Sequence, residues 1–494
     1  VTGVQTCALP IWALLSSGES YQMPNLYRRI NLVLTYDLPF TYFRGMRAQM
    51  LAQLPRARWT QWVVRDASWF TGAVTTQGNF EATWTGGRSD AFGDHANGQY
   101  GVLGLWACER SGYPISNKIW QAIDQHWRKA QDPKSGGWAV GEVGKAKQAF
   151  EARVSGPMTA GGVSVLSLTE RYLYGPKLTG VGEESMSDEL RNGIGWLDTN
   201  FSLDDKAEQE DFYYYMWTIQ RVGHVTGYRT FNDIDWYRHV TARLLNMQKD
   251  NGRWDGPKGE LLSTGFALLY MAQARRPLAI SKVRFDHPWN NRPHDVLNFV
   301  DYASDVFEVP FTWQIAELDQ PVHELIESPM LYFATHESFG LENQQIENLR
   351  KYVDAGGLLV CVPEGRSAGD SLRSYRNLAE RLFGRDAAPV RIDREHPFYS
   401  LHSPLSPAVT MQVVHNGVRP VMIIFNRDIG VQLQTNDRVR TDSFVALSNI
   451  YLYVSGMNPR RARLDTQYVV QQVESPKNKL AAARVRHAGQ YNPE

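Results

Sequence analysis

The sequence predicts a multi-domain chain with an all-α N-terminal half and an α/β C-terminal half. Three observations carry this prediction. Apolar residues recur at helical spacing between about residues 28 and 279, where helix pairs return in altered copies. Short apolar runs then alternate with amphipathic helices, which is typical of a doubly wound, mostly parallel sheet. The 494 residues are enough for two or three domains.

The composition narrows the classes of partner. The chain has 52 Lys and Arg and 52 Asp and Glu, so its formal net charge is zero. This balance argues against broad electrostatic binding to nucleic acid or anionic membranes. No apolar run reaches the roughly 18 residues of a transmembrane helix, and no phosphate-binding loop is present. We expect no cofactor and no nucleic acid, and a small molecule or a protein as the partner.

The first eleven residues have a separate origin in our interpretation. Residues 1–11 read VTGVQTCALPI and resemble the translation of a short-read sequencing adapter. We expect them to be an artefact, with no function for Cys7, and exclude them from the fold. The natural N-terminus would then be missing, so both an exported or periplasmic and a cytoplasmic location stay open.

The helices of the first half are predicted from the periodicity of their apolar residues and from residues that typically end a helix. The run 99–112 has apolar residues at helical spacing and ends in Gly112, which suits a helix C-cap. A polar amide follows every second helix, and the stretch 131–138 then makes a tight turn. The four amides are Gln77, Gln131, Asn200 and Gln248. The other predicted helices cover 118–130, 160–172, 213–226 and 261–274.

This unit of two helices, an amide and a Gly-Gly-Trp turn resembles the repeat of the terpenoid cyclase and protein prenyltransferase α/α toroid. The closest stretches are 127–138 and 213–254. The resemblance implies that residues 12–279 form a toroid of such repeats, truncated at its N-terminus. It implies that the amide and the glycines make the turn while the aromatic residue fills the layer between helix pairs. Such a packing signature says little about chemistry.

Most catalytic residues of these families do not carry over, although Asp211 matches the aspartate of the prenyltransferase zinc site. The cyclase acid cluster has its nearest match at Asp204 and Asp205, which we interpret as helix capping. Where prenyltransferases bind zinc through cysteine and histidine, this chain has Tyr213 and Leu261, so we expect no metal site. The candidates for a toroid cavity are Asp94, His95, Tyr100, Asp211, Tyr213, Tyr214 and Trp217. The alternative is that the first two cap a helix and the rings fill core.

Strands and helices alternate in the second half, and Pro293 suits the first turn of a helix. The predicted strands cover 282–285, 311–315, 329–334 and 358–362, with a hairpin-like pair at 410–414 and 420–425. The predicted helices cover 293–304, 342–355, 371–383 and 442–454. The polar tail 458–494 is expected to be loosely ordered.

This half resembles, over residues 281–457, the bacterial family called domain of unknown function 4159. The segments that carry the resemblance include 289–298, 308–311, 331–337, 349–358 and 396–398. The resemblance implies a flavodoxin-like or class I glutamine amidotransferase-like fold and brings no established activity. Bacterial proteins that join such a domain to a toroid are part of the same resemblance.

The nucleophile of the amidotransferases is not in its place. Those enzymes carry a cysteine on a sharp turn after a strand. Here the turn position holds Glu364, and Cys361 lies two or three residues earlier, inside the apolar run. We therefore interpret Cys361 as a buried structural thiol.

Polar residues nevertheless follow several of the predicted strands. The carboxyl ends of parallel strands share one edge, where open α/β sheets bind ligands. The candidate ligand-binding residues are Trp289, Asn290, Asn291, Arg292, His336, Glu337, Glu364 and Arg366. The alternative is that these residues make turns and caps.

Three functions remain open. The one we favour is a non-catalytic ligand-binding or assembly protein that combines an aromatic-lined toroid with a degenerate amidotransferase-like domain. The second is a hydrolase or transferase that uses His336, Glu337 and Glu364. The third is a terpenoid cyclase or prenyltransferase, and the missing acid cluster and zinc ligands count against it.

Overall fold

The computed structural model describes most of the chain. The tail 458–494, the pair Asp204 and Asp205, and Arg366 lie outside the described residues. The described ranges are 8–37, 39–86, 93–141, 152–182, 186–203, 211–365, 369–385 and 387–456.

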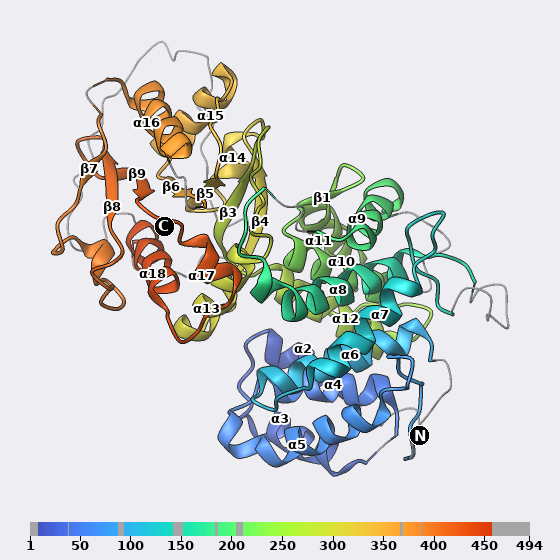
Figure 1. Cartoon of the computed structure of the whole chain (residues 1–494). Helices are drawn as coiled ribbons and strands as arrows, with labels where there is room; N and C mark the ends of the chain where they lie inside the picture. The colour runs from blue at the N-terminus through green and yellow to red at the C-terminus, as the bar shows by residue number, and fades with distance from the viewer. Residues whose placement is uncertain are drawn as a thin grey trace.

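Six helices of the first half contact one another in a closed cycle (Figure 1). Each contacts the next, and the last contacts the first again. We call this cycle the inner ring, and its members are α2 (Ala8–Ser16), α4 (Thr41–Leu51), α6 (His95–Arg110), α8 (Gly156–Leu173), α10 (Phe212–Thr226) and α12 (Glu260–Ala274). Further helices lie against its members: α3 (Pro24–Thr35), α5 (Arg56–Ala73), α7 (Asn117–Lys129), α9 (Asp188–Asn200) and α11 (Trp236–Met247).

The helix ends follow the signals in the sequence. Asp94 caps α6 by accepting a hydrogen bond from the Asn97 amide at 2.7 Å. Gly112, two residues after the end of α6, has φ +95°, which a residue with a side chain rarely adopts. The prediction that a helix ends there is confirmed.

Two of the repeat turns close with the same hydrogen bonds. The Nε2 atom of Gln131 donates to the carbonyl of Gly136 at 2.7 Å, and that of Gln248 donates to the carbonyl of Gly252 at 2.9 Å. The indoles that end these turns, Trp138 and Trp254, each donate to a carbonyl of the preceding helix. These two turns, both predicted from the sequence, therefore share one local structure.

The third amide, Asn200, behaves differently from its predicted counterparts. Its side chain donates to the carbonyl of Trp196 within its own helix, α9, and is exposed. The physical reason is local: no Gly-Gly-Trp turn follows Asn200, so its amide has no turn carbonyl to reach.

Residues 8–11 begin α2, which closes the inner ring between α4 and α12. Ala8, Leu9 and Ile11 are buried, and Leu9 lies directly over Gly265 of α12. The adapter origin of residues 1–11 stays a prediction, but the exclusion of all eleven from the fold does not match this arrangement. An apolar run such as Ala-Leu-Pro-Ile packs into an open seam whatever its origin.

The second half is built on a seven-stranded sheet of order β4-β3-β5-β6-β9-β8-β7 (Figure 1). The first five strands in this order are parallel to one another. Strand β8 pairs antiparallel with β9, and β7 pairs antiparallel with β8. Their bounds are β3 (Leu278–Arg284), β4 (Thr312–Glu317), β5 (Met330–Thr335), β6 (Leu358–Pro363), β7 (Val390–Arg391), β8 (Met411–His415) and β9 (Pro420–Phe425). The predicted mostly parallel sheet and its hairpin pair are confirmed.

Helices cover both faces of the sheet, so the half is doubly wound. One face packs against α13 (Asp295–Phe307), α17 (Gly430–Gln434) and α18 (Asp442–Val454). The other face packs against α14 (Val322–Leu325), α15 (Asn343–Asp354) and α16 (Gly369–Phe383). Each face has its own buried apolar cluster, as Figure 1 shows for the two helix layers.

The boundary between the halves is earlier than the sequence indicated. Strand β3 begins at Leu278, so residues 278–279, which we assigned to the helical half, lie in the sheet. Leu278, Ala279 and Ile280 are buried there and continue the apolar face. The sequence misled because these residues also extend the apolar pattern of the preceding helix.

The two halves meet along the edge strand β4. The Ile315 amide donates to the carbonyl of Gly227, just after α10, at 2.7 Å. Arg171 of α8 reaches α13, with an ion pair to Asp301 at 2.6 Å and a hydrogen bond to Asn298 at 2.7 Å. The helical half thus covers an edge strand that would otherwise offer unpaired backbone groups.

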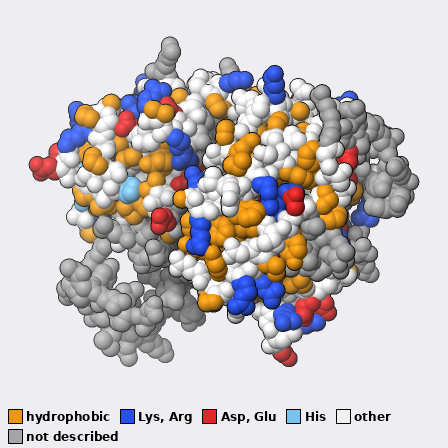
Figure 2. Space-filling view, turned by 90° about the horizontal axis from the view of Figure 1, so that it is seen from below, with side chains coloured by type: hydrophobic (Ala, Val, Ile, Leu, Met, Phe, Trp, Pro, Cys, Tyr) orange, Lys and Arg blue, Asp and Glu red, His pale blue; other side chains and the backbone are white. Residues whose placement is uncertain are grey.

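The outer surface is mixed in character. Figure 2 shows hydrophobic side chains interspersed with Lys, Arg, Asp and Glu on the face seen from below. Neither sign of charge dominates the coloured residues of this face, in keeping with the zero formal net charge.

Candidate functional site

The strand order places a topological switch point between β3 and β5. The chain passes from β3 to β4 on one side and then returns to β5 on the other. Open α/β sheets bind ligands beyond the carboxyl ends of their strands at such a point. The loops that follow β3, β5 and β6 therefore frame the candidate site.

Three of the predicted residues meet there, one from each loop. The Nδ2 atom of Asn291 donates to Oε2 of Glu364 at 2.6 Å and lies 3.2 Å from Nδ1 of His336. Asn291 follows β3, His336 follows β5 and Glu364 follows β6. Chain segments up to 73 residues apart thus contribute to one polar cluster, which we call the switch-point cluster.

Glu364 is the chemically unusual member of this cluster. Its side chain is fully buried, and burial raises its pKa to about 7, because desolvation outweighs Lys282 and the Asn291 hydrogen bond. Asp295 and Asp428 push the pKa further in the same direction. One carboxyl oxygen, Oε1, has no hydrogen-bond partner. Glu364 can therefore gain or lose a proton near neutral pH.

A segment of the helical half lies across this cluster. We call residues 175–182, which follow α8 and begin with the short helix η1 (Gly175–Lys177), the strap. The Gly182 amide donates to Oδ1 of Asn291 at 2.9 Å, and the Gly180 carbonyl accepts from Arg292. A Cβ added at Gly182 would lie 3.5 Å from Nε2 of His336. The strap thus occupies the edge where a ligand would enter.

Arg292 holds the strap rather than facing a crevice. Its guanidinium is fully buried and pairs with Asp428 at 2.7 Å while donating to the strap. Asp428 also accepts from the Gly365 amide at 2.8 Å. A planar guanidinium suits such a bridge because it donates in several directions at once.

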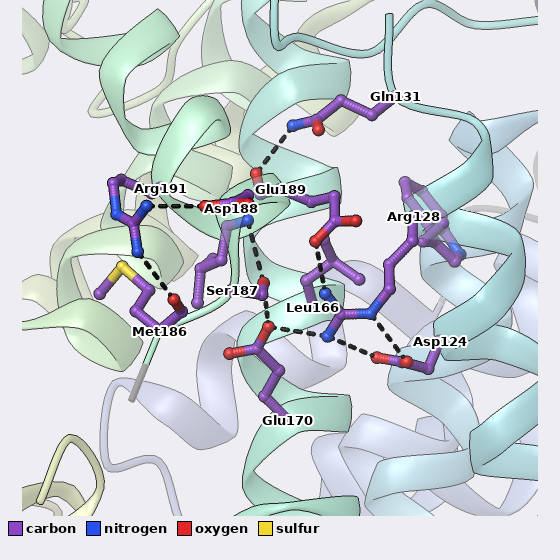
Figure 3. Close-up of polar contacts among 12 residues, drawn as sticks. Asp124, Arg128, Gln131, Leu166, Glu170, Met186, Ser187, Asp188, Glu189 and Arg191 are labelled. Atoms are coloured by element: carbon purple, nitrogen blue, oxygen red, sulfur yellow. Dashed lines mark hydrogen bonds and ion pairs between the residues drawn. The ribbon is translucent and has the colours of Figure 1, made fainter. Parts of the chain in front are cut away.

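A second network fixes the point at which the strap leaves α8 (Figure 3). Arg128 of α7 forms ion pairs with Asp124 at 2.9 Å, Glu170 at 2.8 Å and Glu189 at 2.7 Å. These partners come from α7, α8 and α9, so one cation joins three helices. The hydroxyl of Tyr174, the residue before the strap, donates to Asp124 at 2.9 Å.

Three other predicted edge residues, Trp289, Asn290 and Glu337, lie outside the cluster. Trp289 is half-buried against the apolar residues of both sheet faces, and Asn290 is half-buried beside it. Glu337 is half-exposed, with a carboxylate oxygen 3.5 Å from Nε2 of His336. Arg366 lies outside the described residues.

Two charged residues that act on Glu364, Lys282 and Asp295, were not among the predicted site residues. Lys282 and Asp295 form a fully buried ion pair at 2.7 Å, and Lys282 also donates to the Arg292 carbonyl at 2.7 Å. A lysine in the middle of an otherwise apolar strand was the available signal, since a buried lysine needs a partner.

Cys361 takes no part in the site. Its side chain is fully buried in the apolar cluster below the α15 and α16 face, and burial raises its pKa well above the ordinary range. The prediction that it is a buried thiol is confirmed, because a nucleophile needs an accessible thiolate.

In the helical half, the candidate aromatic residues separate into two groups. Tyr100, Tyr214 and Trp217 meet inside the inner ring, with ring centroids 5.9 to 6.4 Å apart. Phe266 joins them at 5.5 Å from Trp217. α6 and α10 are not neighbours in the cycle, so contacts between Tyr100 and α10 cross the interior and fill part of it.

The remaining toroid candidates are engaged elsewhere. Tyr213 donates to the carbonyl of Asp255 at 2.8 Å, and Asp211 pairs with Lys258. Asp94 caps α6. His95 is buried with its Nδ1 atom 2.7 Å from the Ala139 carbonyl.

No metal centre emerges in the described ranges. Among these residues, no group of three or more His, Cys, Asp and Glu side chains is arranged to hold an ion. At the positions of the prenyltransferase ligands, Leu261 is exposed and the Tyr213 hydroxyl is used by a backbone carbonyl. Within the same described residues, every helix is too short or too polar to span a membrane.

Comparison with known proteins adds one finding. No curated protein matches this chain. Residues 279–454, which begin one residue into β3 and end with α18, match the family described as "Domain of unknown function (DUF4159)".

Proposed function

We propose that this chain is a non-catalytic ligand-binding and assembly protein, in which the α/β half uses its ligand edge to hold the helical half. One observation carries the proposal: the strap occupies the switch point through Asn291 and Arg292. A surface that in other open α/β folds receives a ligand here receives a segment of the same chain.

The finer identity of each half belongs to the same proposal. The closed inner ring with its repeated Gln131 and Gln248 turns supports an α/α toroid. The parallel order β4-β3-β5-β6-β9 supports a flavodoxin-like or amidotransferase-like domain. That domain would be degenerate, because Glu364 stands at the nucleophile turn and Cys361 lies in core.

Release of the strap tests the assembly role. We expect Arg292→Met to speed hydrogen exchange of the strap amides about tenfold or more relative to α8, because charge-assisted hydrogen bonds are lost. Arg284→Met is the matched control, since Arg284, the last residue of β3, pairs with Glu317 and both side chains are partly exposed. Unchanged strap exchange in Arg292→Met would contradict the proposal.

A second candidate function is a hydrolase or transferase that uses the switch-point cluster. The observation in its favour is Glu364, whose pKa of about 7 suits general acid or base work, linked to His336 through Asn291. This chemistry requires the strap to move. Turnover of amide or ester probes that disappears in Glu364→Gln would favour this candidate over the non-catalytic proposal.

A further inference from the structure

One cation, Arg221, reaches across the interior of the inner ring. Arg221 lies on α10, seven residues after Tyr214, so both project from the same helical stripe. Its Nη1 atom donates to Oε1 of Gln99 on α6 at 3.5 Å, and its guanidinium carbon lies 4.9 Å from the Trp217 ring centroid. The hydrogen bond to α6 crosses the ring interior.

No carboxylate balances this charge within the described part of the chain. Arg221 forms no ion pair there, and Asp94 and Asp211 are used by the α6 amide and by Lys258. Burial accordingly lowers the pKa of Arg221 to about 10, with only Tyr214 and Tyr100 acting against it. An arginine placed among aromatic rings without a counter-ion costs free energy that a bound anion would recover.

Gln99 provides a second, independent observation. Its side chain is fully buried, and its Nε2 donor has no hydrogen-bond partner. The same amide accepts from Arg221 through Oε1. A donor left unsatisfied beside a guanidinium is the arrangement that receives the oxygen atoms of an anion.

These groups are in part accessible to a ligand. Arg221 and Tyr214 each keep part of their surface accessible, whereas Trp217 and Phe266 are buried around them. A ligand entering there would meet one positive charge, one amide donor and several aromatic faces.

We propose that the inner ring binds a small organic anion, with its carboxylate or phosphate group on Arg221 and Gln99 and its apolar body against Tyr214, Trp217 and Phe266. This inference rests on the ligand-binding part of the proposed function and names its ligand class.

Calorimetric titration of the intact chain tests the proposal with benzoate, phenyl phosphate and the neutral benzamide. We expect benzoate or phenyl phosphate to bind with one site per chain, and the stronger of the two identifies the head group. Benzamide should bind about 10- to 100-fold more weakly, because it lacks the charge that Arg221 requires.

Variants assign the binding to the site. Arg221→Met should weaken anion binding about 10- to 100-fold, whereas Arg221→Lys, which keeps the charge, should restore most of it. Arg65→Met is the matched control, because Arg65 lies 4.4 Å from the Trp62 ring centroid but on the outer helix α5. It should bind benzoate as the parent chain does.

Three outcomes would overturn the inference: no saturable anion binding, equal binding by Arg221→Met, or failure of Arg221→Met to fold. The last would show that Arg221 makes a structural contact. Strap exchange is a separate readout that Arg221→Met should leave unchanged. If Arg292→Met did not change the hydrogen exchange of the strap, the assembly role would be contradicted, but the anion-binding proposal would not be affected.

Discussion

The α/β half and the interior of the inner ring differ in how their buried cations are compensated. In the α/β half, Lys282 pairs with Asp295 and Arg292 pairs with Asp428, and both cations also donate to backbone carbonyls. In the inner ring, Arg221 has one long hydrogen bond to a neutral amide and an aromatic face. A buried cation with its counter-ion in place has a structural role, whereas a buried cation without a counter-ion is a candidate binding group for an anion.

The same contrast holds within the helical half. Arg44 and Arg47, on the same ring helix α4, share the buried Asp66 at 3.0 and 2.5 Å. The helical fold is therefore able to supply a carboxylate to a buried arginine. Its absence beside Arg221, among the residues that the structure describes, is a local property of the ring interior.

The largest expected effect comes from breaking a completed pair. Asp295→Ala leaves Lys282 buried and uncompensated, and we expect the free energy of unfolding to fall by about 3–5 kcal/mol. Urea denaturation measures this. Arg385→Ala, which removes an ion pair between exposed residues, should change stability by less than about 0.5 kcal/mol. A small loss in Asp295→Ala would mean that Lys282 is held by the Arg292 carbonyl alone.

Some helix and strand bounds were predicted from the sequence more accurately than others. Helix α18 matches its predicted bounds 442–454, and α10 and α12 begin one residue before theirs, because each is framed by local signals. Strand β3 was predicted too short because its first apolar residues continue a helical pattern. The other predicted strands begin within one residue of their observed starts, so the error at β3 is confined to the junction of the two halves.

The site was foreseeable only in part. Asn291, His336 and Glu364 were brought together by one rule, that polar residues after parallel strands share an edge. The strap was not foreseeable, because Gly182 and Asn291 are 109 residues apart and nothing local in either sequence indicates the contact. Arg221 was also missed, since an arginine in a helix usually reaches solvent.

The next effect is the dependence of stability on pH that Glu364 of the switch-point cluster produces. The pKa of Glu364 in the folded state, about 7, lies above its ordinary value of 4.5, so the folded state holds the proton over this interval while the unfolded state loses it. Stability should therefore fall as pH rises from about 4.5 to above 7, by an amount on the order of 3 kcal/mol.

Glu364→Gln isolates this contribution. The amide cannot ionise, so the difference between its unfolding free energies at pH 5 and pH 8 should be smaller than that of the parent chain. Denaturation at the two pH values measures it, with Glu337→Gln as the control because Glu337 is half-exposed. Identical pH profiles for the parent and Glu364→Gln would show that the pKa of Glu364 is the same in the folded and unfolded states.

The smallest expected effect compares two buried amides. Asn291 accepts from the Gly182 amide and donates to Glu364, so Asn291→Leu should lower the free energy of unfolding by about 1–3 kcal/mol through its unsatisfied partners. Gln99 makes one long hydrogen bond and has an unsatisfied donor, so Gln99→Leu should cost less than about 1 kcal/mol in the absence of an anion. Adding benzoate should then stabilise the parent chain and Asn291→Leu but not Gln99→Leu, because only the last has lost a donor to the anion. Thermal unfolding with and without benzoate measures both differences. Equal stabilisation of all three chains by benzoate would show that the anion does not bind at Gln99. It would also remove the contrast between the paired cations of the α/β half and Arg221 of the inner ring.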